Sequence, residues 1–185
     1  GKMKMDPIWD WNLSFGNANY LEGGRTNGYY APAVGDADYP WYRRLFSDPD
    51  FHQKHIDRWT ALRTNVFATG NVLGRVDAIT NLLNEAQARD FAKWPRLGTY
   101  IWPNPDGANT TTADGLTNTW DVNFATTTTF PSVIGEMKRW IEGRVAWIDT
   151  GFTKPPTFSQ YGGPVSPGTV LTIAAPAGTI YYTLN

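Results

Sequence analysis

The sequence predicts a mainly α-helical protein with a short β start and a β-rich tail. Three stretches, 48–66, 70–94 and 131–151, repeat apolar side chains every three or four residues, which is typical of amphipathic helices. Residues 2–15 alternate large apolar and polar side chains, as a strand does. After Gly151 the chain has only short runs of β-forming residues separated by Gly and Pro.

The composition is that of a folded domain. Of the 185 residues, 41% are hydrophobic, with nine each of Trp, Tyr and Phe, which is enough material for one packed core and too much for a disordered chain. A net charge of −1 offers no attraction to nucleic acid or an anionic membrane, so neither is an expected partner. The absence of cysteine excludes disulfides, a thiol nucleophile and a thiolate zinc site. No apolar run is long enough for a membrane span.

The elements follow in order along the chain. Residues 2–15 are expected to form one or two strands, and the glycine-rich residues 16–40 a long irregular loop. A helical turn is expected at 41–46. The next helix should begin with Asp48 as N-cap and Pro49 in its first turn. Its apolar face consists of Phe51, His55, Trp59, Leu62 and Val66.

Two longer helices are expected further on. One should start after Gly70 with Asn71 as its cap and end before Pro95. Its stripe is Val72, Val76, Ile79, Leu83 and Ala86. The other should follow Pro131 and end at Gly151. Its faces combine Val133, Met137, Trp140, Arg144 and Trp147 with Ile134, Ile141 and Ile148. The Trp side chains of the helices are expected to be buried, and residues 96–128 between the two helices to be an insertion or surface loop.

The tail begins with a stiff linker at 153–156 and continues with strand candidates at 158–159, 170–173 and 180–183. Three short strands predict the start of a β-sandwich, a partial one. Because an unfinished sandwich leaves strand edges unpaired, we expect the tail to be disordered or to pair with another chain, for example in a dimer.

The strongest candidate for chemistry is Asp10, at the end of the first predicted strand. A carboxylate there suits Mg²⁺, and Asn12, two residues on, would face the same side of a strand. Trp9 and Trp11 would lie on the opposite face and support the site. The alternative is a structural Asp that caps a turn or pairs with an arginine. His52 and His55 lack a third ligand, so packing is the better interpretation for them. No nucleophile elbow, Walker loop or Rossmann glycine pattern is present.

Five segments in order resemble the C-terminal part of the spore-coat protein H (CotH) kinase-like family. They are Trp9–Gly16, Tyr42–Phe51, Arg58–Arg63, Val76–Arg89 and Lys138–Asp149. The resemblance implies the C-terminal lobe of an atypical protein-kinase-like fold over residues 1–152. It also implies transfer of phosphate from ATP to a protein substrate with a divalent metal such as Mg²⁺.

By this resemblance Asp10 corresponds to the metal-binding Asp that follows the catalytic loop. Asn12 stands where family members often carry Asp, so it would coordinate through its carbonyl without adding charge. The nucleotide-binding Lys and the catalytic Asp and Asn would lie upstream of Gly1. The chain alone is therefore expected to be inactive and to hold neither Mg²⁺ nor ATP tightly.

The tail, residues 153–185, resembles the opening of a chitobiase/β-hexosaminidase C-terminal-type module. Such modules are common in secreted bacterial proteins, which implies an extracytoplasmic location. Two alternatives to a kinase fragment remain open. One is a non-catalytic scaffold or pseudokinase lobe, and the other is an extracellular carbohydrate-associated module. Mg²⁺ and ATP binding that depends on Asp10 would favour the kinase, and binding of soluble sugars the module.

Overall fold

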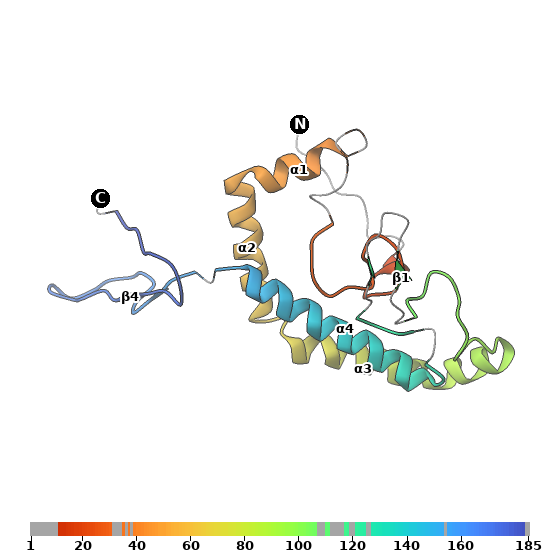
Figure 1. Cartoon of the computed structure of the whole chain (residues 1–185). Helices are drawn as coiled ribbons and strands as arrows, with labels where there is room; N and C mark the ends of the chain where they lie inside the picture. The colour runs from red at the N-terminus through yellow and green to blue at the C-terminus, as the bar shows by residue number, and fades with distance from the viewer. Residues whose placement is uncertain are drawn as a thin grey trace, which may run out of the picture.

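The computed structural model describes residues 11–30, 35, 37, 39–106, 110–111, 117–118, 121–124, 127–153 and 155–183. Its helices are the 3₁₀ helix η1 (Trp11–Leu13) and the α-helices α1 (Pro40–Ser47), α2 (Pro49–Arg63), α3 (Thr69–Lys93) and α4 (Phe130–Gly151). Two antiparallel strand pairs join β1 (Thr110–Thr111) to β2 (Thr117–Asn118) and β3 (Thr157–Phe158) to β4 (Ile173–Ala174). Figure 1 shows α4 lying along α3, with the β3–β4 tail away from the helices. The mainly helical prediction is confirmed.

The predicted starts of α1 and α2 are confirmed. The Asp48 carboxylate accepts a hydrogen bond from the Phe51 amide at 2.9 Å, and Pro49 occupies the first turn of α2. This side chain satisfies one of the amides that have no partner within a helix. The helical turn at 41–46 lies within α1.

α4 has a reciprocal cap and α3 has none. The Thr129 hydroxyl accepts from the Ser132 amide at 3.2 Å, and the Ser132 hydroxyl accepts from the Thr129 amide at 3.2 Å. The prediction of Asn71 as the cap of α3 is wrong, since the helix begins at Thr69 behind Ala68. The Asn71 side chain instead donates to the Asn65 carbonyl at 2.7 Å and ties the α2–α3 connection together.

α3 and α4 run antiparallel. The rings of Phe91, near the end of α3, and Phe130, at the start of α4, lie 6.1 Å apart. Asp77, in the first half of α3, binds Lys138 of α4 at 2.7 Å. No helix among the described residues is long and apolar enough to cross a membrane.

The small core of the described residues lies where the loops meet α4. Ile141 and Ile148 of α4 are buried, together with Ala18, Pro105 and Val122. Val122 is only 1% exposed, so residues 96–128 do not lie wholly at the surface as a surface loop would. Within this segment the Phe124 amide donates to the Pro105 carbonyl at 2.9 Å, and the Asn123 amide donates to the Glu136 carboxylate of α4 at 2.9 Å.

The predicted β start and β tail are both corrected in part. Residues 11–13 form η1 because the Ser14 amide bonds back to the Trp11 carbonyl at 2.9 Å, and no described strand pairs with them; residues 2–10 lie outside the described residues. Trp11 is 62% exposed and lines the same pocket as Asn12, so it does not lie on an opposite strand face beneath it; Trp9 lies outside the described residues. In the described tail only β3 and β4 pair, and 180–183 form no strand, so no β-sandwich is present there. Of the helix Trp side chains expected to be buried, Trp41 is exposed.

Candidate functional site

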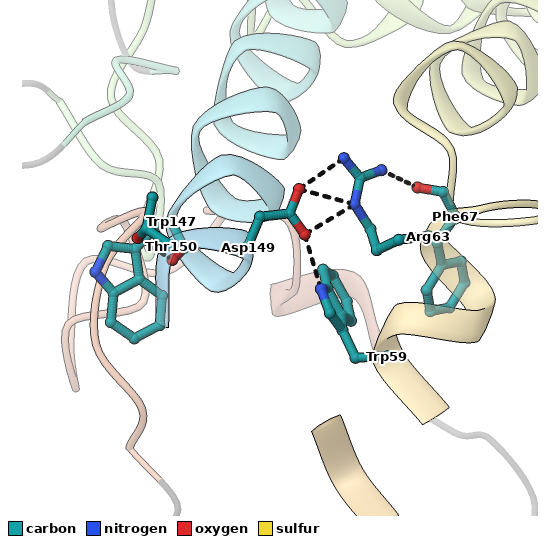
Figure 2. Close-up of polar contacts among 6 residues, drawn as sticks. All are labelled: Trp59, Arg63, Phe67, Trp147, Asp149 and Thr150. Carbon is teal, nitrogen blue, oxygen red and sulfur yellow. Dashed lines mark hydrogen bonds and ion pairs between the residues drawn. The ribbon is translucent and has the colours of Figure 1, made fainter. Parts of the chain in front are cut away.

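One ion-pair cluster fixes α2 against the end of α4. Asp149 accepts hydrogen bonds from the Trp59 indole at 2.9 Å and from Nη2 of Arg63 at 2.8 Å, and Arg63 also donates to the Phe67 carbonyl (Figure 2). Trp59 and Arg63 belong to α2, and Phe67 lies in the turn that follows it. The cluster is therefore a structural joint, and Asp149 is not a free carboxylate for catalysis.

Asn12 lies at a pocket of about 510 Å³ formed by the N-terminal segment, the end of α3 and the start of α4. Its side-chain amide makes no hydrogen bond with any described residue, while its backbone carbonyl accepts from the Asn17 side chain at 3.1 Å. The pocket is within the size range of small-molecule sites in proteins. Its lining consists of Trp11, Asn12, Ser14, Phe15, Asn17, Phe91, Arg96, Leu97, Ile101, Asn104, Phe124, Val133, Ile134 and Met137. We call it the Asn12 pocket.

The segment that carries Asn12 is held in place by Trp140 of α4. Gly16 has a φ of 85°, and a Cβ there would come within 2.5 Å of the Trp140 ring, so only glycine fits. Phe15 packs edge-on against the same ring, with the centroids 6.4 Å apart. The Trp140 indole donates to the Arg25 carbonyl at 3.1 Å. The position of Asn12 is thus set by α4 through its close contact with residues 15 and 16.

The polar groups of the Asn12 pocket suit an anion or a polar ring more than a bare cation. Three amide side chains, one hydroxyl and the Arg96 guanidinium line it beside aromatic and aliphatic groups. No described carboxylate is among the lining residues, and no three metal-binding side chains come together in the described part of the chain. Asn12 can supply one neutral oxygen to Mg²⁺, and the negative charge of a metal site would have to come from Asp10.

A second polar cluster joins the loop at 24–30 to α4. The Asp121 carboxylate accepts from the Thr26 amide at 2.6 Å and from its hydroxyl at 2.7 Å. Arg144 donates from Nη1 to the carbonyls of Thr26, at 3.0 Å, and Gly28, at 2.6 Å. A Cβ at Gly143 would come within 2.8 Å of the Thr26 side chain, so this glycine permits the close approach. The loop is therefore tied to α4 through Arg144 and to the segment at 121–124 through Asp121.

The Arg144 guanidinium lies beside two aromatic rings, Tyr29 and Trp147, which contact each other edge to face with their centroids 5.1 Å apart. Its central carbon lies 5.2 Å from the centroid of Tyr29 and 5.0 Å from that of Trp147. Burial lowers the pKa of Arg144 from its ordinary value, and Tyr29 opposes that shift. Burial likewise raises the pKa of Tyr29, which Arg144 partly offsets. Arginine stays charged at neutral pH even so.

His55 packs in an aromatic pocket and binds no described polar partner through Nδ1. Its ring lies 5.4 Å from Phe152 and 5.6 Å from Phe46. Burial lowers the pKa of His55, and the neighbouring His52 lowers it further. The structure thus agrees with packing as the role of His55.

The structure brings together only part of the predicted site. Asn12 lines a pocket, but in a 3₁₀ turn and not in a strand, and Asp10 lies outside the described residues. Sequence reasoning missed the group of Thr26, Tyr29, Asp121 and Arg144. One signal was visible: Arg144 is a charged residue within the apolar stripe of its helix.

The model of the family described as CotH kinase protein matches residues 1–148. The match covers most of the chain, and the protein belongs to this family. Neither the curated proteins nor the solved structures contain a match to the chain.

Proposed function

We propose that the protein to which this chain belongs transfers phosphate from ATP to a protein hydroxyl with Mg²⁺, and that Asp10 and Asn12 hold the metal. The observation that carries the proposal is the free amide of Asn12 at the edge of a pocket, in a chain of the CotH kinase family. Mg²⁺ binds one or two protein oxygens and completes its shell with phosphate oxygens and water.

The chain's own residues would do three things in this reaction. Asn12 would orient the metal through its carbonyl oxygen, Arg96 would offset phosphate charge, and Phe91 with Leu97 would exclude water from one side of the pocket. Mg²⁺ would supply neutralisation of the charge that develops on the phosphate. We propose that the chain alone transfers no phosphate.

Calorimetric titration with Mg²⁺ and ATP tests the proposal. We expect weak, millimolar binding, lost in Asp10→Asn and tightened by about tenfold in Asn12→Asp, because the second carboxylate adds the charge that asparagine lacks. Asp50→Asn is the matched control, since it removes an exposed carboxylate at the start of α2. Binding that is unchanged by both site variants would favour a scaffold or pseudokinase lobe. Phosphate transfer by the chain alone would contradict the expected inactivity.

The tail is proposed to be the opening of a chitobiase-type β-module in a secreted protein. The antiparallel pairing of Thr157 with Ala174 and Phe158 with Ile173 supports a β-structured beginning of the tail. Tyr181 is 90% exposed and Val170 is also exposed, so this segment has apolar surface that a further strand or a second copy would cover. Light scattering of the whole chain and of a variant ending at 153 tests the pairing. A dimer that becomes a monomer supports it, and a monomer in both cases contradicts it.

A further inference from the structure

Arg144 has one edge engaged and one edge open. The two carbonyls of Thr26 and Gly28 take the hydrogens of Nη1. No described residue accepts a hydrogen bond from Nε or Nη2, and neither atom is among the buried polar atoms without a partner, so both reach solvent. The pair Nε–Nη2 is the edge with which arginine binds carboxylates and phosphates through two parallel hydrogen bonds.

The guanidinium is also held in one orientation. It lies against the rings of both Tyr29 and Trp147 and is anchored by the two carbonyls, so little side-chain freedom remains to be lost when a ligand binds. The Tyr29 hydroxyl is buried and has no partner among the described residues. The Arg144 guanidinium is therefore fixed and charged, with protein acceptors on one edge only. Its other edge can bind an added acceptor, whereas a purely structural arginine would use both edges.

The surroundings complete a pocket of about 400 Å³. Arg144 and Arg25 line it with one carboxylate, Glu22, which lies 3.6 Å from Arg25 and is half exposed. Two guanidinium groups face one carboxylate. None of the lining residues belongs to the Asn12 pocket, so the two sites are separate.

We propose that this pocket, the Arg144 pocket, binds an oxyanion, a carboxylate or a phosphate group, through Nε and Nη2 of Arg144. The group is either a free ion or the end of an acidic or phosphorylated side chain of a polypeptide. The site lies outside the proposed metal site, so it stands even if Asn12 binds no metal.

Nitrogen-15 NMR of the arginine side chains tests the proposal on the whole chain. Arg144→Lys assigns the Nε resonance of Arg144 by its loss. We expect this resonance to shift and saturate on addition of inorganic phosphate at millimolar concentration, with the resonance of the exposed Arg139 unchanged. An unchanged Arg144 resonance in phosphate, acetate and phosphopeptide would overturn the proposal.

Variants and ligands separate binding from structure. Arg144→Lys keeps a donor for the two carbonyls but loses the two-bond edge, so phosphate binding read at the Asn27 and Gly28 amides should weaken at least about tenfold. Arg139→Lys, on the same helix and exposed, should bind as the parent does. Equal binding by Arg144→Lys would overturn the proposal. A peptide with one phosphoserine that binds tighter than inorganic phosphate identifies a polypeptide source, and equal binding identifies the free ion.

Discussion

The two longest helices, α3 with 25 residues and α4 with 22, differ in what covers them. Ile141 and Ile148 of α4 are buried, and Trp140 and Arg144 bind loop carbonyls. α3 has no buried residue among those described, and its Leu82 is 82% exposed. Both helices have the apolar period of an amphipathic helix. The period therefore predicts that a helix forms, whereas contacts with other segments decide whether its apolar side chains are buried.

The largest effect should separate the two helices directly. Ile141→Ala should lower the free energy of unfolding by about 2–4 kcal/mol, because the side chain is only 4% exposed and its removal leaves a cavity. Leu82→Ala on α3 should change it by less than about 0.5 kcal/mol. Urea unfolding followed by circular dichroism measures both. Similar losses in the two variants would mean that α3 is covered in solution as α4 is.

The joint between α2 and α4 should come next. Asp149→Asn removes the carboxylate that accepts from Trp59 and Arg63, which should cost about 1–2 kcal/mol because both charged side chains are only partly exposed. Glu85→Gln removes the ion pair of Glu85 with Arg89 on α3, which is well exposed, and should cost almost nothing. Urea unfolding of the two variants measures both losses. Equal losses would mean that the Asp149 cluster does not hold α2 against α4.

Changes at the N-caps of α4 and α3 should alter the stability by smaller amounts and in opposite directions. Thr129→Ala breaks the reciprocal cap of α4 and should cost about 1 kcal/mol. Ala68→Ser adds a cap to α3, whose N-cap lacks a side-chain hydrogen bond, and should gain about 0.5–1 kcal/mol. Thermal midpoints of the two variants against the parent chain measure this. A loss in Ala68→Ser would show that α3 does not begin at Thr69.

The smallest effect is a pH dependence from His55. Its pKa in the folded state lies below the ordinary value of 6.5, so between the two values the unfolded chain binds more protons. Stability from this group is complete above 6.5 and is lost as the pH falls. The thermal midpoint should drop less between neutral and mildly acidic pH in His55→Phe than in the parent chain. In His52→Gln most of this drop should remain. An unchanged slope in His55→Phe would assign the dependence to another group.

The helices were predictable because their signals are local. The Asp48–Pro49 start and the stripe from Val133 to Ile148 are contained in neighbouring residues. The Asn71 cap was wrong because its side chain had a competing acceptor, the Asn65 carbonyl, which the pattern did not show. The burial of Val122 and the contacts of Arg144 with Tyr29, Thr26 and Gly28 depend on segments that are distant in the sequence, and no local pattern contains them. The Asn12 position was predictable as a candidate, but its 3₁₀ turn was not.

The proposed nucleotide site at the Asn12 pocket can be tested by replacing Mg²⁺ with paramagnetic Mn²⁺ in the presence of ATP. NMR signals of nuclei near the ion broaden first. We expect the Asn12 side-chain amide and the backbone amides of Ser14, Asn17 and Asn104 to broaden at low Mn²⁺, and those of β3 and β4 to remain sharp. Broadening that begins elsewhere, or that is the same with and without ATP, would contradict a metal–nucleotide site in this pocket.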